Sequence, residues 1–283
     1  MRAVDVQVSP VRIRWVARQV QSNCSGSSCT QQKHFLCCTV LVLHPIKHGT
    51  VRLAVLSDIH ANLQALQAAL RVAEQAEIDA IYCLGDIVGY NADPGPCIDL
   101  VRKHCEIVVQ GNHDRAVATG EGVETLPPNA QAAVSYQRSV LTEAQLSFLK
   151  ELPLLEVVGD CTLVHASPDA PSAWKRLSAY RDIRAQFDHF DTPFCFTGHT
   201  HVPAVIANTL GVFEVRAGHR YLINVGSVGQ PRDHTPKGSI VLFDTEKPYH
   251  RCLRFAYDVE GAAERIKEAG LPERLAQRIY KGQ

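Results

Sequence analysis

The segment Leu53-Ala54-Val55-Leu56-Ser57-Asp58-Ile59-His60 decides the fold. Its first half is a run of apolar and branched side chains, which is typical of a strand that is buried on both faces of a sheet. Its second half brings a carboxylate and an imidazole, two positions apart, to the carboxyl end of that strand. Because residues i and i+2 of an extended backbone point to the same side, we expect Asp58 and His60 to hold one cation together. This pair alone is a weak signal, since the same residues also end strands and cap helices.

Strands and helices alternate after this segment. Apolar residues at helical spacing follow Asn62, which predicts a helix with that residue as its N-cap. Residues 79–84 and 106–110 read as two further strands, each of which ends in polar residues. Three successive strand-helix units predict parallel strands with right-handed crossovers. Ligand sites in such sheets lie beyond the carboxyl ends of the strands.

The rest of the chain predicts a second group of strands between helices. A helix is expected at 129–140, and Thr142 with Gln145 forms a capping box for the next one. Strand-like segments, which we expect to pair as antiparallel runs, then cover 154–158, 161–165, 194–196, 204–206, 212–215, 221–225, 239–243 and 252–257. Helical patterns at 261–269 and 272–280 close the chain. The sequence therefore predicts one domain over residues 51–283, with two packed sheets flanked by helices.

Residues 1–50 differ from the rest of the chain. Their periodicity is too poor to predict a packed element, and they hold four of the ten cysteines, Cys24, Cys29, Cys37 and Cys38. The spacing of these cysteines lacks the paired knuckles of a structural zinc site. We therefore expect an N-terminal extension without packed structure or an artefact of an upstream translation start, with Val51 as the true first residue.

The composition is that of a soluble globular protein. Hydrophobic residues make up 46% and charged residues 20% of the chain, and 29 basic side chains balance 29 acidic ones. This balance predicts neither bulk nucleic-acid binding nor an anionic membrane surface as partner. No apolar run reaches the ~20 residues that span a bilayer. The six cysteines after residue 80 lie mostly in apolar stretches and read as buried free thiols, which suits the cytoplasm.

Polar residues that bind metals gather at the ends of the predicted strands. They are Asp58, His60, Asp86, Asn112, His113, His165, His199 and His201. Any one of these histidines is more often structural than a ligand, but eight such positions make coincidence a poor explanation. Two cations ~3.5–4 Å apart need a bridging group such as a carboxylate, and together they activate water for an in-line displacement, as phosphate-ester hydrolysis requires. Mixed Asp, His and Asn ligation favours Mn, Fe, Zn or Ni over Ca.

The ordered motifs resemble those of the calcineurin-like metallophosphoesterases. The matching residues are Asp58-x-His60, Gly85-Asp86, Gly111-Asn112-His113-Asp114, His165 and Gly198-His199-x-His201. Further segments, including 226–233 and the C-terminal region, are similar to a bacterial single-domain branch described as phosphoesterases or phosphodiesterases. The resemblance covers residues 51–283.

This resemblance implies a fold, a metal site and a reaction. The fold is a four-layer αββα sandwich of two mixed sheets flanked by helices. Two divalent ions are expected, manganese before iron, zinc or nickel, with Asp86 as the bridge. The resemblance places Asp58, His60 and His201 on one ion and Asn112, His165 and His199 on the other. His113 is not a ligand in this scheme but assists a metal-activated hydroxide at the leaving oxygen, and Asp114 orients His113.

One departure concerns phosphate binding. Protein phosphatases and diadenosine-tetraphosphate hydrolases of this superfamily carry an arginine shortly after the Gly-Asp motif, where this chain has Tyr90. Arg115 and Arg232 are the candidates that replace that arginine in contacting phosphate.

The favoured function is a metal-dependent phosphoesterase acting on a small phosphate ester, with diesters slightly ahead of monoesters. The first alternative is an inactive scaffold or binding protein that keeps the fold. The second is a protein phosphatase, against which the missing arginine counts. The sequence carries no signal for an oligomeric state.

Overall fold

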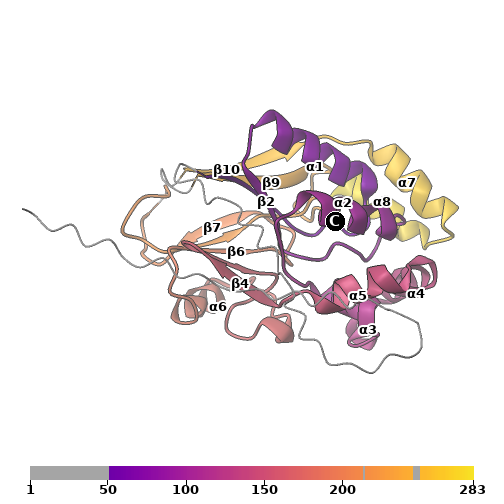
Figure 1. Ribbon diagram of the computed structural model, residues 1–283, viewed down its shortest axis with the longest axis horizontal. Coiled ribbons are helices and arrows are strands. Elements are labelled where there is room, and N and C mark those ends of the chain that lie inside the picture. Colours follow the sequence, from indigo (N-terminus) through magenta and orange to yellow (C-terminus); the bar gives the residue numbers. More distant parts are fainter. Residues whose placement is uncertain (1–50, 213, 245–248) are drawn as a thin grey trace, which may run out of the picture. The chain divides into compact units, whose positions relative to one another are not determined.

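The computed structural model describes residues 51–212, 214–244 and 249–283. The expectations for residues 1–50 lie outside this part of the chain. Two five-stranded mixed sheets form the centre of the described part, and helices flank them (Figure 1). This architecture confirms the predicted α/β sandwich.

The first sheet combines strands from both ends of the described chain. Its order is β10-β9-β1-β2-β3. Strands β1, β2 and β3 run parallel, while β9 pairs antiparallel with both β1 and β10. The bounds are Arg52–Leu56 for β1, Ala80–Cys83 for β2, Ile107–Val108 for β3, Gly238–Asp244 for β9 and Tyr249–Phe255 for β10. Helices α1 (Leu63–Gln75) and α2 (Pro94–His104) make the first two crossovers.

The second sheet has the order β4-β5-β6-β8-β7. Its strands are β4 (Leu155–Val158), β5 (Cys161–Val164), β6 (Phe194–Thr197), β7 (Ala204–Ala207) and β8 (Tyr221–Asn224). The expectation of antiparallel runs is wrong for its centre, because β5, β6 and β8 pair parallel and only the edge strands are antiparallel. The connection from β5 to β6 contains helix α6 (Tyr180–Ala185), which permits a crossover. Residues 212, 214 and 215 form no strand, so the prediction of a strand at 212–215 is also wrong.

The remaining helices cover the sheets or surround the strand ends. They are α3 (Asn112–Thr119), α4 (Pro128–Val140), α5 (Glu143–Glu151), α7 (Val259–Glu268) and α8 (Glu273–Lys281), with short 3-10 turns at Val123–Thr125, Pro171–Ala173 and Gln186–Asp188. The predicted caps are confirmed: the Asn62 side chain accepts from Ala65 N at 3.1 Å, and Thr142 accepts from Gln145 N at 3.3 Å.

Strand β1 shows why the sandwich has four layers. Successive side chains of a strand point to opposite faces. Ala54 and Leu56 pack into the core shared with α1 and α2, whereas Leu53 and Val55 pack into the core between the two sheets. A further apolar cluster covers the outer face of the second sheet, where Phe187 packs beside α6. The strand is therefore buried on both faces, as its apolar run predicts.

The cysteines after residue 80 are free thiols. Four of them, Cys83, Cys97, Cys161 and Cys195, are buried, which confirms the expectation for these positions. Burial raises the pKa of each of these thiols, so they behave as small apolar core residues.

The loop after β8 closes the fold against the end of β1. Gly229 N donates to the carbonyl of Asp58 at 3.0 Å, and the Asn62 side chain donates to the carbonyl of Gly229 at 2.9 Å. A Cβ atom at Gly229 would lie 1.8 Å from the carbonyl oxygen of Ile59, which is backbone and has no rotamer to escape into.

Gly229→Ala is therefore expected to lower the free energy of unfolding by about 1–3 kcal/mol, measured by urea titration. Gly95→Ala is the matched control, since its nearest neighbour is the flexible side chain of Gln145 at 3.3 Å. Equal unfolding midpoints for the two variants would contradict the close packing of this loop.

Candidate metal centre

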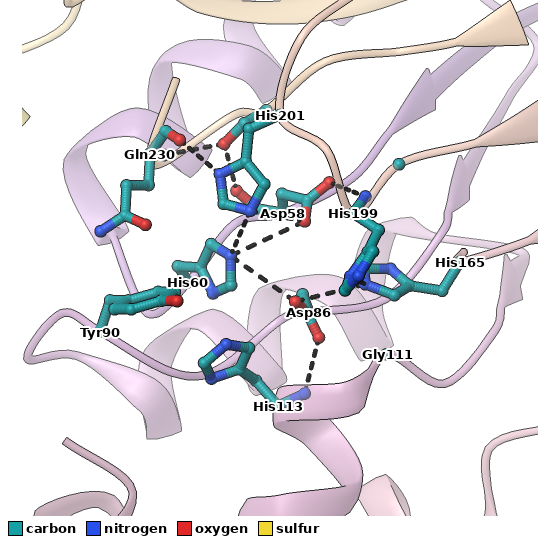
Figure 2. Close-up of polar contacts among 12 residues, drawn as sticks. Asp58, His60, Asp86, Tyr90, Gly111, His113, His165, His199, His201 and Gln230 are labelled. Carbon is teal, nitrogen blue, oxygen red and sulfur yellow. Dashed lines mark hydrogen bonds and ion pairs between the residues drawn. The ribbon is translucent and has the colours of Figure 1, made fainter. Parts of the chain in front are cut away.

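The strand-end side chains converge beyond the carboxyl ends of the parallel strands of both sheets. Figure 2 shows histidines and aspartates from both sheets facing a common centre. Their potential ligand atoms form three groups in which all atoms lie within 4.8 Å of one another. The groups are Asp58 with His60 and His201, His60 with Asp86 and His113, and Asp86 with His165 and His199.

The backbone at these residues is unusual. Five of the converging residues have positive φ angles between 50° and 64°, namely Asp58, His60, Asp86, His199 and His201. Non-glycine residues rarely adopt this left-handed conformation, and instances cluster at functional sites. The extended geometry assumed from the sequence is thus wrong, because β1 ends at Leu56 and the ligands sit on tight loops. The expected outcome, with Asp58 and His60 in one group, is nevertheless found.

In the first group, backbone carbonyls fix the tautomers of two histidines. Nδ1 of His60 lies 3.0 Å from the carbonyl of Val88, and Nδ1 of His201 lies 2.5 Å from that of Gln230. Since a carbonyl only accepts, both Nδ1 atoms carry the proton, and burial lowers the pKa of both rings. Their Nε2 atoms therefore present bare lone pairs, and these two atoms lie only 3.2 Å apart.

The Asp58 carboxylate completes this group. Its Oδ1 lies 3.1 Å from Nε2 of His201 and 3.7 Å from Nε2 of His60. Its Oδ2 accepts from the backbone N–H of His199 at 2.9 Å, which ties the loops of the two sheets together. Burial opposes ionisation of Asp58, but the adjacent His201 and His165 hold its pKa below the usual range. An ionised carboxylate between two lone pairs is an arrangement that a cation stabilises.

The group of Asp86, His165 and His199 repeats this pattern. Nδ1 of His165 lies 2.8 Å from the carbonyl of Leu84, and its Nε2 lies 3.3 Å from Nδ1 of His199. Oδ2 of Asp86 lies 3.3 Å from Nε2 of His165 and 3.6 Å from Nε2 of His60. Burial opposes the charge on His165, yet Asp86 raises the pKa of that ring to about 9. The Asp86 carboxylate therefore faces His60 of the first group as well as His165 of its own group.

Helix α3 fixes the Asp86 carboxylate from the other side. Its Oδ1 accepts from the backbone N–H of His113 at 2.8 Å, in the first turn of the helix, where an anion is stabilised by the helix dipole. A Cβ atom at Gly111 would lie 2.1 Å from this oxygen, so only glycine fits there. The Gly85-Asp86 motif and the Gly111-Asn112-His113 motif therefore pack directly against each other.

His113 lies at the edge of the cluster. Its ring centroid is 4.9 Å from that of His60 and 4.6 Å from that of Tyr90. Its Nδ1 is buried and has no hydrogen-bond partner among the described residues. Burial lowers the pKa of His113 to about 4, although Asp86 opposes this shift.

Asp114 does not contact the His113 imidazole. Its Oδ1 accepts from the backbone N–H groups of Ile87 and Val88 at 2.8 and 3.2 Å, and its Oδ2 accepts from that of Gly111 at 2.9 Å. Burial and the nearby Asp86 raise the pKa of this carboxyl to about 7. These hydrogen bonds join the Asp86 loop to α3, and the role of Asp114 in orienting His113 stays a prediction.

Two buried oxygens show that the donor set fits a metal. Oδ1 of Asn112 and Oδ1 of Asp58 are buried without a hydrogen-bond partner among the described residues. An unpaired buried acceptor is costly, and both atoms belong to residues that the sequence predicts as ligands. Together with the bare Nε2 lone pairs, they form a mixed N/O donor set of the kind that binds divalent transition metals.

The two candidate phosphate-binding arginines differ in their surroundings. Arg115 is partly exposed and donates to the Glu121 carboxylate at 2.9 and 2.6 Å. Arg232 donates to the Tyr90 hydroxyl at 3.2 Å, and its guanidinium carbon lies 5.6 Å from the centre of the Tyr90 ring. Arg232 is therefore the arginine beside the cluster.

Tyr90 is the neighbour that sequence reasoning undervalued. It is buried, it has a φ of 57°, and its ring contacts His60 edge-on at a centroid distance of 4.7 Å. The sequence signal is its position after the Gly-Asp motif, where protein phosphatases of this superfamily carry an arginine. Trp174, whose ring lies 6.0 Å from that of His165 and whose φ is 51°, carried no signal.

The fold and the histidine-aspartate cluster define a metal-dependent phosphoesterase domain. The model of the calcineurin-like phosphoesterase superfamily domain matches residues 51–248. The chain belongs to this family, and the family implies divalent metal ions at the cluster.

Related proteins match over most of the described part. "Uncharacterized protein MJ0912" of Methanocaldococcus jannaschii is 37% identical over 241 residues, which cover 81% of this chain and 98% of that protein. A metallophosphoesterase from Sphaerobacter thermophilus is similar in structure, with a TM-score of 0.73, 36% identity and coverage of 82% of this chain and 99% of that chain. Hypothetical protein PH1004 from Pyrococcus horikoshii OT3 has a TM-score of 0.70 and 25% identity, with coverage of 82% and 99% respectively.

Among the described residues, no helix has both the length and the apolar character required to cross a bilayer.

Chelation of bound metal is expected to lower the unfolding temperature by about 5–10 °C, because a ligand that binds only the folded state stabilises it and because the facing lone pairs then repel one another. The measurement is differential scanning calorimetry before and after dialysis against EDTA. Adding back Mn²⁺ should restore the unfolding temperature. An unfolding temperature that neither EDTA nor added Mn²⁺ changes would contradict a metal-binding cluster.

Proposed function

We propose that this protein is a dinuclear metal-dependent phosphoesterase that hydrolyses phosphodiester or phosphomonoester bonds, with diesters favoured from the family resemblance. The observation that carries the proposal is the position of Asp86. Its Oδ2 lies within 3.6 Å of histidine Nε2 atoms in both ligand groups. A carboxylate shared in this way is the group that a two-metal centre requires as a bridge.

Each side chain of the cluster has a role in this proposal. Asp58, His60 and His201 would hold one divalent ion, Asn112, His165 and His199 would hold the other, and Asp86 would be shared between them. Manganese is the first expectation, with iron, zinc and nickel as alternatives. When bound, the ions supply Lewis acidity to the attacking and leaving oxygens of an in-line displacement. The Nδ1–H bonds to backbone carbonyls orient His60, His165 and His201 for this task.

His113 and Arg232 act on the substrate. The His113 imidazole lies beside His60 and Asp86, from where it assists departure of the leaving oxygen by donating a hydrogen bond or a proton. Arg232, next to Tyr90, contacts the phosphate and replaces the arginine of the protein-phosphatase branch. Asp114 positions the Asp86 loop, and Arg115 is engaged by Glu121. The buried free thiols support a cytoplasmic location.

The purified protein with Mn²⁺ should hydrolyse bis(4-nitrophenyl) phosphate or 4-nitrophenyl phosphate, followed by release of nitrophenolate. Activity should disappear with EDTA and return with added metal. Absence of turnover with all of Mn²⁺, Fe²⁺, Ni²⁺ and Zn²⁺ would contradict the proposal and favour a scaffold that keeps the fold without the chemistry.

His113→Ala should lower kcat by about 100-fold or more, because it removes a group that acts on the leaving oxygen. The metal content, measured by inductively coupled plasma mass spectrometry, should stay near that of the wild type. The matched control is His104→Ala, an exposed histidine in the last turn of α2.

The metal content decides between two roles of His113, since one of its ring nitrogens lies within 4.8 Å of potential ligand atoms of His60 and Asp86. Loss of metal in His113→Ala would make this residue a ligand and overturn its assignment as a group that acts on the leaving oxygen.

A further inference from the structure

A cavity of about 720 Å³ lies beside the metal centre. Three segments line it: Tyr90, residues 127–130 at the start of α4, and the face of α8 with the chain that follows it. Its volume falls in the range of small-molecule binding pockets. We call it the α8 pocket. The residues of α8 that line it are Arg274, Gln277, Arg278 and Lys281.

The charge of the α8 pocket is positive. Arg274, Arg278 and Lys281 recur at the spacing of one helix face, and neither Arg274 nor Lys281 has a carboxylate partner among the described residues. Other arginines of the same chain do have one, as Arg254 has in Asp233 and Arg265 in Asp93.

Arg278 shows the consequence of this crowding. Burial and the like charges of Arg232 and Arg274 lower its pKa, and its Nε donates to the carboxyl-terminal oxygen of Gln283 at 2.8 Å. The N-terminus of α4, which has no acidic residue in its first turn, adds the positive end of a helix dipole to the same wall. The single Gln283 carboxyl group offsets only part of this positive charge, so an anion that binds beside Arg274 and Lys281 is stabilised.

Tyr90 connects the α8 pocket to the metal centre. On one side its ring contacts the rings of His60 and His113 at 4.7 and 4.6 Å. The guanidinium carbons of Arg232 and Arg278 also lie 5.6 and 5.3 Å from its centre. The same side chain lines the pocket. A substrate whose scissile phosphate lies at the metal centre therefore reaches the pocket by passing Tyr90.

We propose that the α8 pocket binds a second phosphate group of the substrate, so that the preferred substrate is a phosphate ester carrying another phosphate on the same small molecule. This inference rests on the proposed function and narrows its substrate class. Guanidinium and ammonium groups are the usual partners of phosphate, and arginine forms paired hydrogen bonds with it. The alternative is that these cations form only a solvent-exposed helix face, in which case they do not discriminate between substrates.

The test compares two esters that differ only in the second phosphate. They are thymidine 5′-(4-nitrophenyl phosphate) and its 3′-phosphorylated counterpart, assayed with the Mn²⁺-loaded full chain. The wild type should prefer the 3′-phosphorylated ester by about tenfold in kcat/KM, mainly through KM. The ratio of the two kcat/KM values should fall toward one in the double variant Arg274→Gln/Lys281→Gln. Both positions are exposed, so the substitutions should not affect folding.

The control is Arg71→Gln/Lys103→Gln, which removes two exposed cations from α1 and α2 and should keep the wild-type preference. A wild-type preference near one, or a preference that the α8 double variant leaves unchanged, would overturn the proposal. Equal losses in the control and the α8 variant would do so too, since they would show an effect of net charge alone.

Failure of the proposed function has a separate signature, because the wild type would then hydrolyse neither ester. Calorimetric titration with thymidine 3′,5′-bisphosphate and thymidine 5′-phosphate then tests the pocket by itself. Tighter binding of the bisphosphate that is lost in the α8 double variant supports the pocket, and equal affinities overturn it.

Discussion

The metal centre depends on a backbone that L-residues seldom adopt. Five ligand candidates have left-handed φ angles, a conformation that costs on the order of 1–3 kcal/mol at each position and persists only where the surroundings impose it. Here the surroundings are hydrogen bonds between loops. The N–H groups of Asp58 and His60 donate to the carbonyls of Gly85 and Asp86 at 3.0 and 2.9 Å, and Asp114 holds the next two N–H groups. The loops after β1, β2 and β3 therefore form one rigid unit.

The electrostatics of the centre follow from that unit. Backbone carbonyls bind the Nδ1–H groups of His60, His165 and His201, so their Nε2 atoms turn toward buried carboxylates, and those of His60 and His201 carry bare lone pairs. Without a cation this arrangement brings lone pairs and negative charges together in a space from which water is largely excluded. With divalent cations, each of these atoms gains a partner. The same reasoning accounts for the buried oxygens of Asn112 and Asp58 that have no hydrogen-bond partner among the described residues.

Much of the site could be predicted from sequence, because short motifs carry both the ligands and the strand ends that present them. The two-sheet architecture also followed from the alternation of apolar runs. Other features could not be predicted, since they depend on contacts between distant residues. The parallel pairing of β5, β6 and β8 is decided by crossovers whose sequence is irregular. Asp114 and Arg115 are neighbours of a motif, yet their partners lie in the Asp86 loop and at Glu121. Tyr90 and Arg278 meet although most of the chain separates them.

Tyr90 thus links two parts of the proposed substrate site, and in the proposed function Asp86 links two metal ions. Anomalous diffraction from crystals grown with Mn²⁺ tests this proposed bridge most directly. Two manganese peaks are expected about 3.5–4 Å apart, with the Asp86 carboxylate between them. A single peak, or two peaks of which Asp86 touches only one, would contradict this bridge.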